Sequence, residues 1–526
     1  WIGQWLWGRD INAFEDLTTA QIASVKAYNV AVDCTTELQA AMDAAWSQKR
    51  NLFLPGGGYL VTGLVLPGTY PTLDERYKAF RMFGQGAGNP FSTLNLGGTV
   101  IKSVTDAPVI KDRPLTAPNA HGSFELDHMR LDGTSNTTAV LHLDSFYGYS
   151  SVHHMSIHQR GIGDGVFIDY GATAVIHECY VTNKDQTTFN LGAARVATGF
   201  NLPNSYGAGL VKIQSCTSRG WKDGYIIGLS AGIQTAQHFS IQNCEVSTCY
   251  NGVTLNEKAE YCVVSELYFE QIEGGIGIID KGSYNKIYGN QITAGHSIGI
   301  DLRTPGFGGV CAWNLISTTT VEGAICINAV TTSGLGRTVC DNTILWGSSG
   351  VINPSTGLPY ANIIGIKVSG ANAQINMSGN MFSPKINWTG SGTYGQIVDI
   401  TTSTLSAGNG QYGLGTASFD NLQVPMLNQG AISLAKGATN ITDVVGGGAT
   451  GAVLLSAASS HVIAFTGAKG VTSFTAPNIE GKYFLVRVTN GNCTFTNGAS
   501  LKMAGAVNYT PGAGGAMVTF LMHSHV

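Results

Sequence analysis

Apolar positions recur along this chain with a long and regular period. Between residues 126 and 342 one unit occurs nine times: an aliphatic residue, two variable residues, a column residue, a variable residue and usually a second aliphatic residue. The units are Leu126-Met129-Leu131, Val152-Met155-Ile157, Ile176-Cys179-Val181, Ile213-Cys216-Ser218, Ile241-Cys244-Val246, Val264-Leu267-Phe269, Ile287-Asn290-Ile292, Cys311-Asn314-Ile316 and Val339-Asn342-Ile344. Their first positions lie 26, 24, 37, 28, 23, 23, 24 and 28 residues apart. Strand-type residues at this period, followed by glycines such as Gly224, Gly252 and Gly275, predict a stacked β solenoid.

The hydrophobic pattern changes at both ends of the repeat. The segment TELQAAMDAAW (36–46) has helical spacing, with Leu38, Met42 and Trp46 on one face and Asp33 or Thr35 as candidate caps. The segment NLFLPGGGYLVTGLVLP (51–67) predicts a strand, a glycine turn and a strand. A short helix here would cover the open apolar end of the solenoid, since terminal repeats need a cap.

The repeat stops after Asn380, and short alternating strands follow. Residues 386–425 are rich in Gly, Thr and Ser and predict a connector. HVIAFTG, KYFLVRVTN and AMVTFLMHSH, separated by glycine turns, predict a small antiparallel β-sandwich. We therefore expect four parts: an N-terminal segment with its capping helix (1–50), the solenoid (51–385), the connector (386–425) and the sandwich (426–526).

Composition narrows the class of protein. Only 12% of the 526 residues are charged and 69 are glycine, which suits tight turns on a polar, weakly charged surface. The net charge of −4 gives no basic field for nucleic acid, and no apolar run is long enough to span a membrane. Cys179, Cys216 and Cys244 share one column, and no C-x-x-C pair exists, so we expect a buried thiol ladder rather than zinc. We expect no metal, no cofactor and folding in a reducing cytoplasm.

A family resemblance begins at the capping helix. LQAAMDAAW followed by LFLPGGGYLVTGLVL resembles the entry to pectate-lyase-like right-handed β-helices, in particular the tailspike depolymerases of bacteriophages, over residues 30–385. The resemblance implies an all-β, right-handed parallel β-helix that acts on a bacterial surface polysaccharide, capsule or O-antigen. It also implies a homotrimer in the virion tail, joined to the baseplate through a more N-terminal region. The C-terminal domain would then assist trimer assembly or glycan binding.

The repeat allows outward-facing residues to be placed relative to one another. Counting the first aliphatic residue as position zero, positions zero, three and five point inward, and positions four and six point outward on the same strand. Glu245 and Glu270 then become diagonal neighbours on one face, with α-carbons about 8 Å apart. Tyr268 lies beside Glu245, and Arg219 lies two turns below Glu270.

Further polar residues gather near this pair. Glu273 follows Glu270 closely, in the register of Tyr250 and Lys222, and His296 lies one turn on. Glycosidic hydrolysis needs one carboxyl as proton donor and another as nucleophile or base, and crowded acids can raise one pKa. For each acid alone, a solvated charge or an ion pair is the plainer interpretation. Because this chain has few charges, their concentration favours a site. The predicted catalytic residues are Glu245, Glu270 and Glu273, and the predicted glycan-binding residues are Arg219, Lys222, Tyr268, Tyr250 and His296.

Two other functions fit the same residues. A polysaccharide lyase acting by β-elimination on a uronate would use Arg219, Lys222, Tyr268 or a histidine as base, with a cation or metal neutralising the carboxylate. A structural adhesin would hold a glycan without cleaving it. An unsaturated, ultraviolet-absorbing product distinguishes the lyase, and binding without shortening distinguishes the adhesin.

A second polar patch and an insertion lie N-terminal to these acids. The patch comprises His153, His154, His158, Asp164, Asp169, His177 and Glu178. We expect these residues to make hydrogen bonds on a loop face rather than to bind metal. The 37-residue step contains an insertion, roughly 182–209, which we expect to form a wall beside the acids. Its Phe189, Phe200 and Tyr206 are candidates either for stacking on sugars or for packing under the loop.

Overall fold

The chain consists of two compact units, Trp1–Ser418 and Phe419–Val526. The computed structural model describes residues 10–67, 79–88, 98–103, 105–112, 123–134, 137–144, 146–186, 191–205, 209–232, 234–293, 295–303, 307–318, 324–330, 336–346, 364–369, 375–378, 380–384, 398–401, 441–445, 451–454, 461–465, 469–475, 483–488, 493–498, 507–510 and 516–521. Among these residues, no helix has the length and apolarity needed to cross a bilayer.

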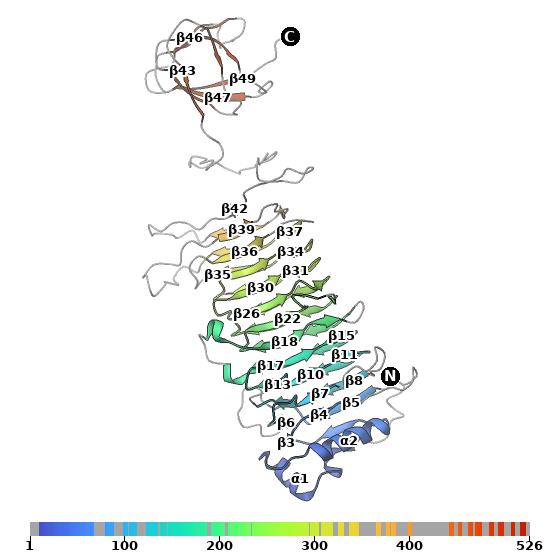
Figure 1. Ribbon diagram of the computed structural model, residues 1–526. Coiled ribbons are helices and arrows are strands. Elements are labelled where there is room, and N and C mark those ends of the chain that lie inside the picture. Colours follow the sequence, from blue (N-terminus) through green and yellow to red (C-terminus); the bar gives the residue numbers. More distant parts are fainter. Residues whose placement is uncertain are drawn as a thin grey trace. The chain divides into compact units, whose positions relative to one another are not determined.

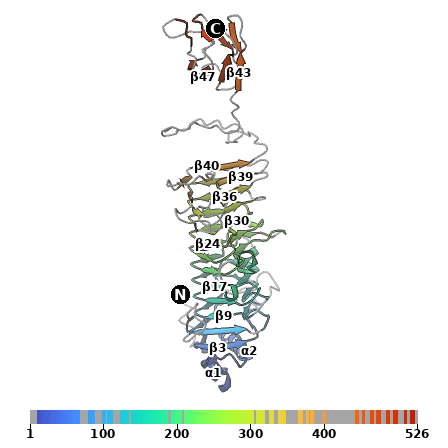
Figure 2. The ribbon, with the colours of Figure 1, turned by 90° about the vertical axis from the view of Figure 1, so that its left-hand side faces the viewer.

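The first unit is a parallel β solenoid with two short helices at its N-terminal end (Figures 1 and 2). Its strands form three long parallel sheets, which we name A, B and C, with 13, 12 and 12 strands. From β2 onward the chain runs repeatedly from sheet A to sheet B to sheet C. The predicted all-β solenoid is confirmed.

The strands of each sheet are given in their hydrogen-bonded order. Sheet A contains β1 (Ile11–Asn12), β2 (Leu52–Leu54), β5 (Ala79–Gly84), β8 (Ser123–Asp127), β12 (Ser151–His153), β16 (Val175–His177), β20 (Lys212–Gln214), β24 (Ser240–Gln242), β28 (Val263–Ser265), β31 (Lys286–Tyr288), β34 (Val310–Ala312), β37 (Arg337–Cys340) and β40 (Ile375–Ser378). Sheet B contains β3 (Gly57–Val61), β6 (Thr99–Ser103), β9 (Arg130–Asp132), β13 (Ser156–Gln159), β17 (Tyr180–Asn183), β21 (Thr217–Arg219), β25 (Glu245–Ser247), β29 (Tyr268–Phe269), β32 (Gln291–Thr293), β35 (Leu315–Thr318), β38 (Thr343–Trp346) and β41 (Met381–Pro384). Sheet C contains β4 (Leu64–Val65), β7 (Ile110–Lys111), β10 (Leu141–Leu143), β14 (Val166–Ile168), β18 (Thr198–Leu202), β22 (Asp223–Ile227), β26 (Asn251–Leu255), β30 (Ile276–Asp280), β33 (Ile298–Leu302), β36 (Ile325–Val330), β39 (Ile364–Ser369) and β42 (Val398–Thr401). Two small parallel sheets comprise β11 (Phe146–Tyr147), β15 (Tyr170–Ala172) and β19 (Asn204–Ser205), and β23 (Ala236–Gln237) with β27 (Ala259–Glu260).

The nine sequence repeats coincide with nine successive turns, from β8 to β37. Their first positions pair in register, for example Ile213 with Ile241 and Ile241 with Val264. Positions four and six share one strand as predicted, for example Glu245 and Ser247 of β25, whereas the first position lies on the preceding sheet A strand. In all nine repeats the residue two places after the first position has a left-handed φ, between 50° and 68°. This corner ends the sheet A strand and starts the sheet B strand.

Inward columns of identical residues hold neighbouring turns together. Cys216 and Cys244 are buried, and burial raises the pKa of both thiols well above the usual range, which fits the predicted hydrophobic ladder. Asparagines replace them in later turns. Asn290 donates to Asn314 and Asn314 donates to Asn342, each at 2.9 Å, so these amides are bonded in the interior.

Two helices cover the N-terminal end of the solenoid (Figure 1). The predicted helix is confirmed as α2 (Thr35–Ser47), which buries Leu38 and Met42 against β2, β4 and β5. The sequence analysis missed α1 (Thr19–Lys26), which packs on β3. The sequence feature that marks this helix is polar: Thr18 and Gln21 form a reciprocal capping box at its start. A search for helical spacing of apolar residues misses it, because its apolar face is short.

The second unit departs from the predicted antiparallel arrangement. One sheet comprises β43 (Ile441–Val445), β45 (His461–Phe465), β47 (Tyr483–Val488) and β49 (Ala516–Leu521). The other comprises β44 (Gly451–Leu454), β46 (Lys469–Thr475) and β48 (Cys493–Phe495). Of these strand pairs only β47 with β49 is antiparallel, and the other four are parallel. Alternating hydrophobicity identifies a strand with one buried face but does not encode its direction, so the prediction was wrong here.

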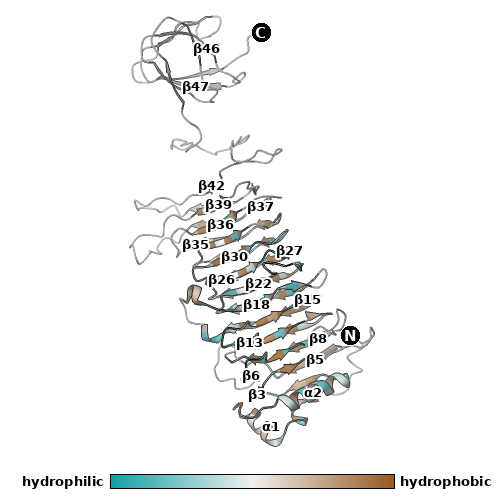
Figure 3. Ribbon diagram, viewed as in Figure 1, coloured by the Kyte–Doolittle hydropathy of each residue, from teal (hydrophilic) through white to brown (hydrophobic). Residues whose placement is uncertain are grey.

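Colouring by hydropathy shows how the solenoid presents its chemistry (Figure 3). Brown and teal positions alternate along its strands, as expected when every second side chain enters the core. On sheet B, position four of β25 and of β29 is polar: Glu245 is half-buried and Tyr268 is exposed.

Candidate active site

Glu245 and Glu270 lie on adjacent strands of sheet B. Glu245 begins β25 and pairs with Tyr268 of β29, and Glu270 follows directly after β29. The predicted diagonal placement of the two acids agrees with this register. Thr217 Oγ1 donates to Glu245 Oε2 at 3.3 Å, and Ser247 Oγ donates to Glu270 Oε2 at 2.6 Å. Each carboxylate is thus positioned by a hydroxyl from the preceding turn.

The two carboxyls are coupled electrostatically. Burial raises the pKa of Glu245, and the negative charge of Glu270 raises it further. The Thr217 hydrogen bond and the Arg219 charge oppose this rise without cancelling it. Glu245 is half-buried and Glu270 is exposed. Glu245 therefore keeps its proton to higher pH than an isolated glutamate does, beside a solvent-accessible second carboxyl.

Glu273 has a different environment from the other two acids. Arg195 Nε donates to its Oε2 at 3.0 Å, and Arg195 Nη2 donates to its Oε1 at 2.8 Å. The Arg195 side chain is fully buried, and that of Glu273 is 10% exposed. Both carboxylate oxygens are therefore engaged in a bidentate pair, which is the environment of a structural anchor. The sequence analysis did not identify Arg195.

Four of the predicted glycan-binding residues are accessible, and one is not. Tyr268 is 44% exposed and Lys222 is exposed, whereas Arg219 and Tyr250 are half-buried. His296 is fully buried, with no exposed surface. A glycan on the outer face would not touch His296 in this conformation. The burial of His296 is therefore at odds with its predicted binding role.

A group of basic residues extends from Arg219 toward the first turns. The η4 segment (Lys184–Gln186), a 3₁₀ turn at the start of the insertion, packs on β13. Burial lowers the pKa of Lys184 to about 8, and the nearby positive charges of Arg130, Arg160 and Arg219 contribute to this shift. Of these cations, Arg219 adjoins the acid pair, because its charge also lowers the pKa of Glu245.

The outward positions of β9 and β13 are buried rather than exposed. Arg130, Asp132 and His158 are 2%, 7% and 0% exposed. Arg130 Nε and Nη2 donate to the two oxygens of Asp132 at 2.9 and 2.8 Å, and His158 Nδ1 lies 3.1 Å from Asp132 Oδ1. Although burial alone would raise the pKa of Asp132, His158 and Arg130 hold it at about 2. We assign this cluster to stability.

The second polar patch of the sequence analysis splits into separate groups. His158 belongs to the buried cluster, and Asp164 accepts hydrogen bonds from the Thr198 backbone N–H and Asn201. Asp169 accepts a hydrogen bond from Asn204. The remaining four residues, His153, His154, His177 and Glu178, gather with His128 at the corner between sheets A and B.

The insertion aromatics are only partly described. Phe200 is a core residue of β18, fully buried and stacked on Tyr225 with ring centroids 4.9 Å apart, so it does not stack on sugars. Phe189 and Tyr206 lie outside the described residues.

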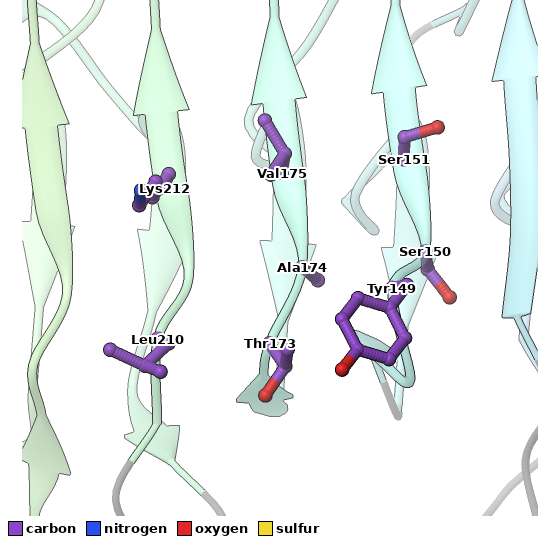
Figure 4. Close-up of a pocket in the computed structure, with 8 residues that line it drawn as sticks. All are labelled: Tyr149, Ser150, Ser151, Thr173, Ala174, Val175, Leu210 and Lys212. Carbon is purple, nitrogen blue, oxygen red and sulfur yellow. The ribbon is translucent and has the colours of Figure 1, made fainter.

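A pocket of about 330 Å³ lies on sheet A and does not coincide with the acid pair (Figure 4). It crosses β12, β16 and β20 and the turns before them, with exposed Tyr149 and Leu210 at its lower end and Lys212 above Leu210 in this view. Its lining is Tyr149, Ser150, Ser151, Thr173, Ala174, Val175, Leu210 and Lys212. None of these eight residues is a carboxylate or a histidine, whereas the acid pair lies on sheet B.

No protein-family model matches this sequence, and no curated protein sequence matches it. Solved structures do match its fold. The Dettilon tailspike protein has a TM-score of 0.43 at 13% identity, covering 71% of this chain and 68% of that one. The A-module of a mannuronan C-5 epimerase from Azotobacter vinelandii has a TM-score of 0.42 at 13% identity, and the match covers 76% of this chain and 100% of that one. A tailspike protein of Escherichia coli bacteriophage HK620, in complex with a pentasaccharide, has a TM-score of 0.40 at 12% identity, covering 75% of this chain and 78% of that one. The chain is structurally similar to phage tailspike proteins and to this epimerase, and at these identities the similarity concerns the β-solenoid fold.

Proposed function

We propose that the protein binds a bacterial surface polysaccharide and cleaves it by glycosidic hydrolysis at Glu245 and Glu270. The observation that carries this proposal is the coupling of the two carboxyls on adjacent strands. Burial and the Glu270 charge raise the pKa of Glu245, which suits a general acid. The Ser247 hydrogen bond holds Glu270 in place to act as the nucleophile or general base.

The two carboxyls divide the reaction between them. Glu245 gives its proton to the glycosidic oxygen as the carbon–oxygen bond breaks, so the departing sugar leaves as an alcohol. In a single displacement Glu270 takes a proton from the water that attacks the anomeric carbon. In a double displacement Glu270 attacks first, and water then releases the sugar. Nuclear magnetic resonance of freshly released product distinguishes the two, because the first inverts the anomeric configuration and the second retains it.

The substrate in this proposal carries negative charge. Arg219 lies close enough to Glu245 to lower its pKa, and Arg160 and Lys184 continue the positive surface toward β13. Lys222 adds an exposed cation three residues after Arg219. Exposed Tyr268 offers a ring edge or face to a sugar next to Glu245. A uronate or another acidic sugar fits these cations better than a neutral glycan.

The proposal also includes assembly and location. We propose a homotrimeric tailspike of the virion tail, joined to the baseplate through a more N-terminal region. Multi-angle light scattering tests the trimer directly. A trimer has a mass three times the 55.2 kDa of the chain. A measured mass equal to one chain at micromolar concentration rejects the trimer.

Paired glutamine substitutions test the chemistry. Glu245→Gln and Glu270→Gln should each slow depolymerisation of purified capsule or O-antigen by roughly 10²- to 10⁴-fold while binding persists. Glu266→Gln is the matched control, since Glu266 is an exposed glutamate at the corner before β29. Wild-type rates in both site variants would reject the assignment. Binding of the glycan without any shortening by the wild-type protein would establish an adhesin and reject the enzyme.

A second mechanism, β-elimination by a lyase, is favoured by one observation. Lys184 has a pKa of about 8, which suits a base that removes the C5 proton of a uronate while the C4–oxygen bond breaks. The departing sugar then takes up a proton, and the remaining uronate keeps a carbon–carbon double bond. Ultraviolet absorbance that rises with digestion and disappears in Lys184→Met would establish this route. Products without the double bond reject it.

A further inference from the structure

A cluster of histidines and carboxylates lies on three successive turns, away from the acid pair. Asp127 and His128 lie at the end of β8, His153 and His154 at the end of β12, and His177 and Glu178 at the end of β16. Each pair lies where a sheet A strand meets the left-handed corner, at residues His128, His154 and Glu178. The corner projects two adjacent side chains per turn, so three turns bring all six groups together.

The central contact is between two ring nitrogens. His153 Nδ1 and His154 Nδ1 are 2.9 Å apart. On the opposite side of each ring, His153 Nε2 lies 3.0 Å from Glu125 Oε1, and His154 Nε2 lies 2.8 Å from Glu178 Oε2. Each carboxylate can only accept a hydrogen bond, so each Nε2 carries the proton. If both rings are neutral, two Nδ1 lone pairs then face the same space, so the contact needs either a proton on one ring or a metal ion beside both nitrogens.

The same pattern is the usual surrounding of a metal-bound histidine, whose second ring nitrogen donates to a carboxylate. Ligand atoms of His128, His153 and His154 all lie within 4.8 Å of one another. His128 Nδ1 lies 3.3 Å from Asp127 Oδ2, which leaves its Nε2 as the ligand atom. The His128 and His154 rings are stacked with their planes 10° apart, so one of these exposed rings must rotate for both to reach the same ion. The side chains of His128 and His154 are 46% and 45% exposed, so an ion can enter from solvent.

We propose that His128, His153 and His154 bind one divalent first-row transition-metal ion, with Glu125 and Glu178 orienting the rings. Arg81 lies 3.4 Å from Glu125 Oε1 and also pairs with Asp127, so these carboxylates are held as orienting groups rather than ligands. The ligand set is therefore nitrogen-rich, which suits Zn²⁺, Ni²⁺ or Cu²⁺ and not Ca²⁺ or Mg²⁺.

The spacing is compatible with one shared ion. Two nitrogens about 2.05 Å from an ion are about 2.9 Å apart at a right angle and about 3.3 Å apart at a tetrahedral angle. The 2.9 Å between the two Nδ1 atoms is close to both values, so Zn²⁺, Ni²⁺ and Cu²⁺ all fit. The ion would join β8 to β12 and does not depend on the proposed hydrolysis.

Isothermal titration with NiCl₂ on tag-free, chelator-treated full-length protein tests the site. We expect one ion per chain, and His128→Asn, His154→Asn and His153→Asn should each weaken binding by about 10-fold or more. His128 and His154 are half-exposed, so their variants should remain folded even if His153→Asn does not. Glu178→Gln should weaken binding less than loss of a ligand.

Two control variants separate this site from other surface histidines. His238→Asn changes a histidine stacked on Tyr261, several turns away, and should bind as the wild type does. A variant with His523 and His525 replaced by Asn addresses the C-terminal histidines and should also leave binding unchanged. With Cu²⁺ bound, electron paramagnetic resonance should show coupling of the Cu²⁺ electron spin to at least two ligand nitrogens. The spectrum of His154→Asn should show one coupled nitrogen fewer. No binding at millimolar Ni²⁺, or equal binding in the three ligand variants, overturns the proposal.

Discussion

Arg195 and Glu273 form a bidentate ion pair across 78 residues of sequence, with Nε–Oε2 and Nη2–Oε1 distances of 3.0 and 2.8 Å. Arg195 belongs to the insertion between β17 and β18, and Glu273 to the connection between β29 and β30, three turns further along. Three turns of a parallel sheet span about 14 Å. The pair therefore fixes the insertion along the edge of sheet B, past the turn that carries Glu245. The wall expected beside the acids stays a prediction, because residues 187–190 and 206–208 of the insertion lie outside the described residues.

Removing one partner of this pair should destabilise the solenoid. Glu273→Ala leaves the buried Arg195 guanidinium without its carboxylate, and we expect a loss of about 3 kcal/mol in the free energy of unfolding. Thermal melting followed by circular dichroism measures it, with Glu266→Ala as a control that should change little. Turnover per folded molecule should remain within a few-fold of wild type. A turnover loss as large as that of Glu270→Gln, at unchanged stability, would make Glu273 catalytic instead.

The buried His158 should make the protein sensitive to mild acid. Burial lowers the pKa of His158 to about 4, below its ordinary value of about 6.5. As pH falls from about 6.5 to about 4, the unfolded chain gains a proton that the folded one does not. Folding stability is then lost over this window, by about 3 kcal/mol in total. Denaturant unfolding at several pH values should show a steeper pH dependence for wild type than for His158→Gln. Parallel curves would contradict the buried neutral histidine.

A glycine column at the start of sheet C should tolerate no side chain. A β-carbon on Gly252 would lie 2.2 Å from Phe269 Cε1 and 2.4 Å from the Gly277 carbonyl oxygen. Gly252→Ala should therefore destabilise by roughly 1–3 kcal/mol or more, because the backbone contact cannot be relieved by a rotamer change. Differential scanning calorimetry measures the shift. Gly498→Ala is the control, since a β-carbon there would meet nothing within 4 Å.

What the sequence could predict depended on local geometry. The side-chain period of a strand and the spacing of the repeats were enough to place Glu245 diagonal to Glu270. They were also enough to align Cys216 with Cys244 in one column. Both relationships follow from register between adjacent turns, which a regular repeat encodes directly.

Relationships that depend on loops were not predictable in this way. His158, at an outward position of the repeat, is buried because η4 packs on β13, and no periodicity reports where an insertion folds. His296 is also buried, and it lies beyond the strands whose register the repeat encodes. Arg195 carried one weak signal, as the one arginine among residues 182–209, but nothing in that segment identifies Glu273 as its partner.

The pH dependence of cleavage should report the environment of Glu245. A general acid works only while protonated, so the rate should fall as pH rises through the raised pKa of Glu245. The Thr217 hydrogen bond and the Arg219 charge both favour the ionised carboxylate and so lower that pKa. Thr217→Val and Arg219→Gln should therefore each move the alkaline limb of the kcat profile to higher pH. Ser156→Ala, at the equivalent position of β13 two turns before Thr217, should leave the limb where it is. A shift to lower pH in either site variant would mean that a group other than Glu245 donates the proton.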